Sequence, residues 1–224
     1  MALLALAHAI RGDAIAVATV DHGLRPEAAR ECAMVVRVCE QRAIACDVIR
    51  VTVGKGNLQD RARAARYAAL GDWAARKGLN AIATAHHADD QAETLLMRLN
   101  RGAGLGGLAG IRASTTIDGC AVPVIRPLLG FRKRELAAII TESGLPSVQD
   151  PSNRDESFDR VRMRAHLATA EWIDPAALAR SAAYLAEAEA TLQAMADERH
   201  PSFSHGRHGL PWPPDQLQVM ADER

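Results

Sequence analysis

The sequence has no glycine loop of the kinds that cradle phosphate. A Walker A loop needs G-x-x-x-x-G-K-[ST], and no such run occurs. The glycine-rich segment RGAGLGGLAG, Arg101–Gly110, follows an expected helix rather than a strand, so it also lacks the context of a dinucleotide-binding fingerprint. We interpret it as a flexible active-site loop, with a plain connector as the alternative.

Aromatic residues, net charge and paired cysteines are also scarce. Aromatics make up 4% of the 224 residues against 48% hydrophobic residues, so the expected core consists mostly of Ala, Leu, Val and Ile. Because 27 Lys and Arg balance 27 Asp and Glu, the global charge does not argue for nucleic-acid binding, although a local patch could. No C-x-x-C pair exists, which disfavours a zinc ribbon or a dithiol redox site; the four cysteines are Cys32, Cys39, Cys46 and Cys120.

The sequence shows no signal peptide or membrane span. The apolar run at the N-terminus, MALLALAHAIRGD, is short, and no basic residue precedes it. Cysteines without obvious disulfide partners favour a reducing compartment. We therefore expect a cytoplasmic protein without a membrane partner.

Expected strands and helices alternate three times along the N-terminal half. Ala14–Val20 is a continuous apolar run typical of a strand buried on both faces, Cys46–Val53 alternates as a strand, and Ala81–Ala85 is a third short strand. This alternation predicts an α/β fold in which helices wind around a parallel sheet. The helices expected around these strands are Ala2–Ile10, Pro26–Gln41, Leu58–Lys77 and Ala88–Asn100.

The pattern changes after Gly110. Thr115–Val124 is expected to form a hairpin around Asp118-Gly119, and three helices should follow. We predict three parts, namely an α/β domain over 1–170, a helical linker over 171–199, and a poorly ordered tail or the stub of a further domain over 200–224. The three expected helices are Phe131–Ser143, Phe158–Ala170 and Pro175–Arg199.

Two histidines and three carboxylates cluster after the third expected strand: His86, His87, Asp89, Asp90 and Glu93. If a helix starts near Ala88, the aspartates lie in its first turn, where they stabilise the helix dipole without any further function. Two histidines at a strand end favour a functional site instead. The carboxylates suit Mg²⁺, which prefers oxygen ligands and bridges to phosphates, whereas a zinc site is weaker because no further ligand is suitably spaced.

Polar residues also follow the first two strands. Asp21 and His22 follow the first, where a simple strand-ending turn is the alternative interpretation, and the Gly54–Asn57 loop follows the second. Ligands of parallel sheets lie beyond the carboxyl ends of the strands. We therefore expect these residues and His86–Glu93 to converge on one crevice.

Arginines recur on three expected helices. In Arg160-Val161-Arg162-Met163-Arg164 the spacing of two places the arginines on different faces, so one could reach a phosphate while others stay in solvent. A second set could form a surface for an RNA backbone, although a solvated helix face is the default for each of them. That set comprises Arg61, Arg63, Arg66, Arg132, Lys133 and Arg134.

Taken together, these segments resemble the tRNA(Ile)-lysidine synthetase family of PP-loop ATP pyrophosphatases. ATAHHADDQAETLLMRLNRGAGLGGLAGI at Ala83–Ile111 is the most specific match, and VDHGLR at Val20–Arg25 resembles the family's second-strand signature. NLQDRARAARYAAL, PVIRPLLGFRKREL and DPSNRDESFDRVRMR are similar to three further family segments. Gln59 stands where the family more often has Glu, and Val161 where it more often has Asn. The resemblance covers about residues 1–170.

The resemblance implies a chemistry and its partners. ATP adenylates O2 of the wobble cytidine of an isoleucine tRNA and releases pyrophosphate, after which the amine of free L-lysine attacks C2 to give lysidine. Mg²⁺ and arginines would offset charge on the transferring phosphoryl group. A homodimer is one candidate assembly.

The resemblance also implies roles for individual residues. Asp90 and Glu93 would serve metal and phosphates, and His86 and His87 the nucleotide pocket, while Arg162 and Arg164 would hold the adenylate or an RNA phosphate. On this basis the predicted catalytic residues are Asp90, His87 and Arg164. The predicted nucleotide-binding residues are Asp21, His22, His86, Gly102 and Arg162, and the predicted RNA-binding residues are Arg61, Arg63, Arg66, Arg132 and Lys133.

One family feature is missing from the sequence. The SGGxDS loop that binds pyrophosphate should directly precede Met1, so we expect the chain to lack that loop and the first strand, and to be inactive by itself. Two other functions stay open. A tRNA thiolase of the same superfamily usually needs a cysteine pair, and a non-catalytic nucleotide- or RNA-binding remnant would need no catalytic loop.

Overall fold

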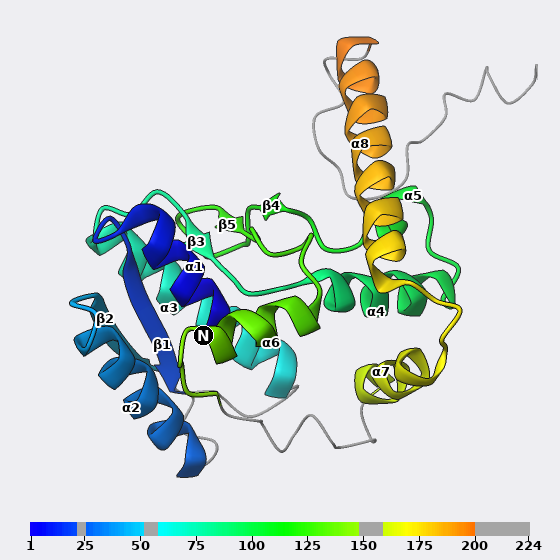
Figure 1. The fold of residues 1–224 in the computed structure, drawn as a ribbon. Helices are drawn as coiled ribbons and strands as arrows, with labels where there is room; N and C mark the ends of the chain where they lie inside the picture. The colour runs from blue at the N-terminus through cyan, green and yellow to red at the C-terminus, as the bar shows by residue number, and fades with distance from the viewer. Residues whose placement is uncertain (22–25, 52–57, 148–158, 200–224) are drawn as a thin grey trace, which may run out of the picture. The chain divides into compact units, whose positions relative to one another are not determined.

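The computed structural model describes residues 1–21, 26–51, 58–147 and 159–199 (Figure 1). The chain divides into two compact units, Met1–Ala186 and Glu187–Arg224. The division falls inside the last helix, α8 (Pro175–Arg199). All interactions discussed below belong to the first unit. His22, the Gly54–Asn57 loop and the tail after Arg199 lie outside the described residues.

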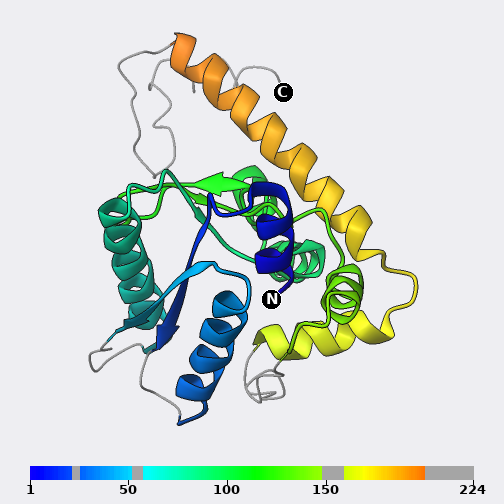
Figure 2. The same cartoon turned by 60° about the vertical axis from the view of Figure 1, so that its left-hand side comes forward.

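The first sheet is a pair of parallel strands, β1 (Ala16–Asp21) and β2 (Ala45–Arg50). Helix α2 (Pro26–Glu40) connects them and packs on both, as Figure 2 shows from a second direction. Parallel strands require such a crossover connection. The β1–α2–β2 arrangement therefore confirms the α/β prediction for the N-terminal part of the chain. The register pairs Ala16 with Ala45 and Asp21 with Arg50, so Asp21 ends its strand beside an arginine.

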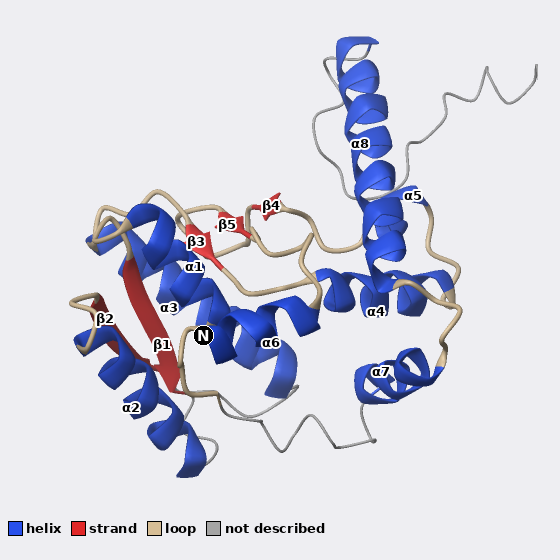
Figure 3. Ribbon diagram, in the orientation of Figure 1, coloured by secondary structure: helices blue, strands red, loops and turns tan. Residues whose placement is uncertain are grey.

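The second sheet has three very short strands in the order β3-β5-β4. β3 (Ile82–Ala83) pairs in parallel with β5 (Val124–Ile125), and β4 (Ser114–Thr115) pairs with β5 in the antiparallel sense. The antiparallel pair confirms the hairpin predicted around Asp118-Gly119, with Gly119 at φ +79°. Over the described residues the strands therefore form two separate sheets, where the sequence predicted one (Figure 3).

Helix α3 (Leu58–Arg76) contributes to one apolar core that both sheets share. Tyr67, Leu70 and Trp73 are buried against Ile82 of β3 and Val124 of β5. Partly buried side chains of the first sheet complete this core: Ala16, Ala18, Val20 and Ile49. Two aromatic rings on one helix supply much of the bulk in an otherwise aliphatic interior.

A smaller apolar cluster joins helix α1 (Ala2–Arg11) to α6 (Lys133–Glu142). Ala2, Leu128 and Leu136 are buried in it. Among the other helices, α4 (Ala88–Leu99) and α7 (Asp159–Thr169) lie where helices were expected, whereas α5 (Leu105–Leu108) is a short turn of helix inside the glycine-rich segment. No helix in the described ranges is long and apolar enough to cross a bilayer.

Candidate functional site

The predicted cluster begins where the second sheet ends. β3 stops at Ala83, the Thr84 N–H donates to Ile125 O at 2.9 Å, and α4 starts at Ala88. His87 is the N-cap of α4: the Asp90 N–H donates to His87 Nδ1 at 3.3 Å, and the His87 N–H donates to Asp90 Oδ2 at 3.0 Å. This reciprocal pair is a capping box. The segment therefore lies at the carboxyl end of parallel strands, as predicted.

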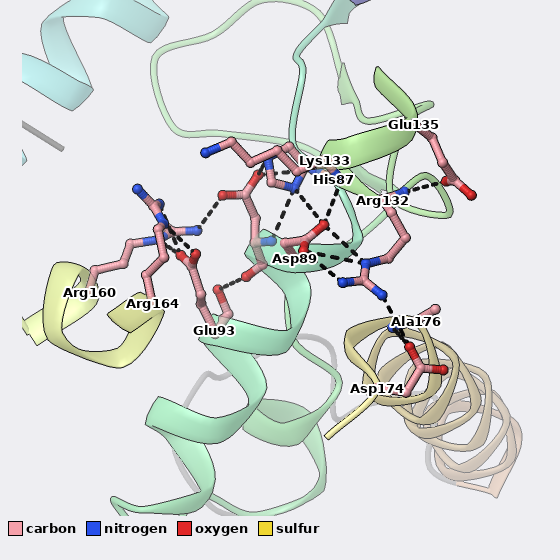
Figure 4. A network of polar contacts seen from close by, with 12 residues as sticks. His87, Asp89, Glu93, Arg132, Lys133, Glu135, Arg160, Arg164, Asp174 and Ala176 are labelled. Carbon is pink, nitrogen blue, oxygen red and sulfur yellow. Dashed lines mark hydrogen bonds and ion pairs between the residues drawn. The ribbon is translucent and has the colours of Figure 1, made fainter. Parts of the chain in front are cut away.

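Asp89 ties α4 to the start of α6. Its carboxylate accepts the Lys133 N–H at 2.7 Å and a hydrogen bond from Arg132 Nη2 at 3.2 Å. Partial burial raises the pKa of Asp89, but the Lys133 N–H and the Arg132 guanidinium outweigh it and hold that pKa below its usual value. Arg132 also pairs with Asp174 at 3.2 Å (Figure 4). The Arg132 guanidinium, predicted to bind RNA, is thus engaged in joining three parts of the chain.

Glu93 is the most deeply buried carboxylate of the cluster, with 2% of its side chain exposed. Arg160 Nε donates to its Oε2 at 2.7 Å, and Arg164 Nε donates to its Oε1 at 2.7 Å. Figure 4 shows both guanidinium groups reaching from α7 onto α4. Arg160 Nη2 also donates to Asp90 Oδ1 at 3.1 Å. The hydrogen bonds to Glu93 raise the pKa of Arg164, so this guanidinium stays charged.

The three arginines of α7 have different roles. Arg160 and Arg164 are four residues apart, which places them on one helix face, the face that meets α4. Arg162 lies between them and pairs with Asp159 at the exposed surface. The prediction selected Arg162 and Arg164 and did not assign Arg160. The i, i+4 spacing is the signal that would have found it.

The described residues form no protein-only metal site. Nowhere in these ranges do three His, Cys, Asp or Glu side chains come together to hold an ion. Both oxygens of Glu93 accept from guanidinium groups, and those of Asp90 accept from Arg160 and the His87 N–H. In this arrangement the two carboxylates bind arginines, and their predicted metal role stays a prediction. Mg²⁺ commonly enters with ligand phosphates and needs few protein ligands.

His86 lies in a cationic environment. Its Nδ1 is 3.1 Å from Thr84 Oγ1. Burial, which is the largest cause, and the positive charges of Arg126, Arg160 and Arg63 together lower the pKa of His86 to about 4, while the charge of Asp90 acts in the opposite direction. The ring is therefore neutral at pH 7. Arg126 belongs to this environment and was not among the predicted site residues.

The glycine-rich segment folds back onto α4. Arg98 Nη1 donates to Gly107 O at 2.8 Å and to Gly110 O at 3.0 Å. Gln91 exchanges two hydrogen bonds with Ile111, of 3.0 and 2.6 Å. This anchoring differs from the flexible loop expected from the glycines, because long side chains of α4 bind its backbone. Gly102, a predicted nucleotide-binding residue, has φ +69°, a conformation that favours glycine.

The remaining predicted residues belong to β1 and α3. Asp21 ends β1 in the first sheet, so its convergence with His86–Glu93 stays a prediction. On α3, Arg61 and Arg63 are exposed, and the Arg63 and Arg66 guanidinium groups lie 5.0 and 5.4 Å from the Tyr67 ring centre. The rings of tyrosines attract such cations. The RNA-binding role of this helix stays a prediction.

Comparisons with known proteins agree with this fold. Residues 1–171 match the family model of the PP-loop domain. Three similar curated relatives are named tRNA(Ile)-lysidine synthase. The one from Novosphingobium aromaticivorans is 49% identical and matches 99% of this chain and 69% of its own length. The one from Zymomonas mobilis is 41% identical over 86% of this chain and 60% of its own length. The one from Ruegeria pomeroyi is 45% identical over 80% of this chain and 43% of its own length.

A solved structure shares the fold. The U34-tRNA thiolase NcsA from Methanococcus maripaludis, with its [4Fe-4S] cluster, superposes with a TM-score of 0.61 at 17% sequence identity. The match covers 76% of this chain and 61% of the thiolase. At this level of sequence identity the match is evidence for a shared fold, and it gives no information about the activity of this chain.

Proposed function

The chain belongs to the PP-loop family of tRNA(Ile)-lysidine synthases, and from that membership we propose that it serves ATP-dependent conversion of the wobble cytidine of an isoleucine tRNA to lysidine. Because the chain spans between 43% and 69% of the three relatives' lengths, this activity is proposed for the protein as a whole. The substrates are ATP, the tRNA and free L-lysine.

The proposed reaction has two steps. Cytidine O2 attacks the α-phosphorus of ATP, the bond to the bridging oxygen breaks, and pyrophosphate leaves. The lysine amine then attacks C2, the C2–O2 bond breaks, AMP leaves with that oxygen, and the amine loses a proton. Adenylation is needed because O2 alone leaves poorly from the ring. Positive charge near the α-phosphate would stabilise both transition states.

One structural arrangement supports the assignment of residues. Asp90 and Glu93 hold the guanidinium groups of Arg160 and Arg164 over the first turns of α4, at the carboxyl end of the β3–β5 pair. Ligands of α/β folds bind at such ends. We assign Arg164 to stabilise phosphoryl charge, and Glu93 to orient it. His87 and Asp90 fix the start of α4, and Mg²⁺ would arrive with the phosphates of ATP.

A chimaera tests the proposal in the context of a whole enzyme. The region of the Novosphingobium relative that matches this chain is replaced by residues 1–199, and the unaltered relative is the positive control. The chimaera is incubated with ATP, Mg²⁺, L-lysine and an isoleucine tRNA with a wobble cytidine. Lysidine is detected by mass spectrometry of the digested tRNA, and pyrophosphate by a coupled assay. A tRNA with a wobble uridine should give neither product.

Two variants on α7 sharpen the test. Arg164→Met should reduce lysidine formation by at least about a hundredfold, because the variant loses positive charge at the phosphoryl group. Arg162→Met, two residues away, should retain activity within about threefold, because Arg162 pairs with exposed Asp159 and this proposal gives the phosphoryl role to Arg164 instead. A chimaera that melts like the relative but forms no lysidine would contradict the proposed function. Equal losses in the two variants would contradict the role of Arg164.

A further inference from the structure

Arg126 is a buried cation with an incomplete set of partners. It follows β5 directly, and only 5% of the residue is exposed. Its Nη1 donates to Arg112 O at 2.8 Å. Its Nε is buried and has no hydrogen-bond partner, and within the described ranges no carboxylate pairs with this guanidinium. A buried charge with an unpaired donor is costly to fold, so a bound group can be expected to meet it.

The surroundings of Arg126 are cationic. Among the described residues, Arg63, Arg126 and Arg160 act electrostatically on His86 as cations, and Asp90, which Arg160 pairs, acts on it as an anion. Neutral His86 adds no charge of its own. Within the described ranges, the charges that act on His86 therefore have an excess of positive sign that an anion would offset.

Arg126 also lies at a position in the fold where ligands commonly bind, the carboxyl ends of parallel strands. β3 and β5 run in parallel, and Arg126 and Thr84 are the residues that follow them. Thr84 Oγ1 contacts His86, which leads to the capped start of α4. Arg126 thus lies at the strand ends, in the surroundings of His86. The chain that follows β5 leads on to α6 (Figure 1).

We propose that Arg126 binds a phosphate oxyanion at the carboxyl ends of β3 and β5, with Nε as a donor and its charge as the counterion. This deepens the proposed function, since the nucleotide would be one source of the phosphate and free phosphate the other. The Nη1 bond to the Arg112 carbonyl fixes the plane of the guanidinium, and the buried Nε is left as a donor without an acceptor.

A purely structural role predicts the opposite stability pattern. If Arg126 only supports the fold through the Arg112 carbonyl, its loss destabilises the chain whether or not an anion is present. If it is an anion site, its replacement by an apolar side chain of similar length removes an unpaired buried charge. That variant should melt at the same temperature as the wild type, or higher, in buffer without phosphate.

The experiment measures thermal melting and isothermal titration with the 224-residue chain at constant ionic strength. The probes are inorganic phosphate, AMP and adenosine, the last of which carries no phosphate. The variants are Arg126→Met, Arg126→Lys and, as a control with an exposed guanidinium, Arg180→Met. Phosphate and AMP should raise the melting temperature of the wild type and of Arg180→Met. The Arg126→Met variant should lose this rise, and its Kd for phosphate or AMP should increase at least about tenfold.

The outcomes separate the two sources and the alternative role. An equal effect of phosphate and AMP identifies a free-phosphate site, and a stronger effect of AMP identifies the nucleotide phosphate. No effect of either probe on the wild type would overturn the proposal, as would Arg126→Met melting lower while it still responds to phosphate. If Arg126→Met does not fold, Arg126→Lys decides: weaker phosphate binding supports the proposal and unchanged binding overturns it. None of these readouts requires lysidine formation, so a failure of phosphate binding by Arg126 can be distinguished from a failure of the proposed lysidine synthesis.

Discussion

Replacement of Glu93 by glutamine should detach helix α7 from α4. No described residue of α7 is fully buried, so apolar packing holds this helix weakly, and the hydrogen bonds of Arg160 and Arg164 to Glu93 join it to the most deeply buried carboxylate of the cluster. The amide side chain in this variant keeps the shape of the carboxylate but loses its charge, and its NH₂ group would face a guanidinium donor. Two arginines would then lose a buried partner.

The expected cost follows from the burial of the partners. Breaking a buried ion pair costs about 3–5 kcal/mol. Glu93 is 2% exposed, but the side chains of Arg160 and Arg164 are 42% and 33% exposed, so water would resolvate them in part. Allowing for that screening, we expect Glu93→Gln to lower the free energy of unfolding by roughly 2–3 kcal/mol.

Urea unfolding, followed by circular dichroism, measures that free energy, and hydrogen exchange with mass spectrometry reports on the amides of α7. Asp159→Asn is the matched control: it removes an exposed carboxylate that also pairs with arginines, and it should change stability by less than about 0.5 kcal/mol. In a double-mutant cycle, Glu93→Gln and Arg164→Met should couple by about 1 kcal/mol or more. If Glu93→Gln matches the wild type within about 0.5 kcal/mol and α7 exchanges no faster, the anchor lies elsewhere and the reasoning fails.

Two further predictions concern His86 and Gly110. His86 has a folded pKa of about 4, below the usual 6.5, so the unfolded state binds a proton first and stability should fall as the pH drops from about 6.5 toward 4. Between about pH 7.5 and 5.0 the free energy of unfolding of the wild type should fall by about 1 kcal/mol more than that of His86→Gln. Equal decreases in urea unfolding experiments would show that protonation of His86 does not cause the loss. Gly110→Ala should cost about 2–4 kcal/mol, because Gly110 has φ +64° and a Cβ would lie 2.5 Å from Gln91 Oε1. Gly104→Ala, at φ −74° with open space around the Cβ, should change the urea midpoint little, and a similar shift in both variants would contradict the steric argument.

The helices were largely predictable from the sequence, because their signals are local. Pro26 begins α2, and Gly144 with φ +61° follows the end of α6, as such residues commonly do. The strands were less predictable. Ala81–Ala85 pairs over two residues only, since strand length depends on a partner that is distant in sequence. Local patterns report helix periodicity well and sheet pairing poorly.

The candidate site was predictable in composition but not in its pairings. The cluster at His86–Glu93 and the arginines of residues 160–164 were recognised, and the structure brings them together. That Arg160 meets Glu93 depends on how α7 lies against α4, across 67 residues of sequence. Arg126 lies in one of the segments that resemble the family, but it was not singled out, because an arginine after a short apolar run is ordinary and only its burial makes it unusual.

The shared apolar core around α3 has a consequence for cooperativity. Tyr67 and Trp73 belong to a core that includes residues of both sheets, so the opening of either sheet exposes apolar surface that the other sheet also helps to bury. Two sheets that could have been independent folding units are thereby made to lose stability together. A destabilising substitution in β1 should therefore also destabilise the ends of β3 and β5, where Arg126 lies, even though the two sheets are separate.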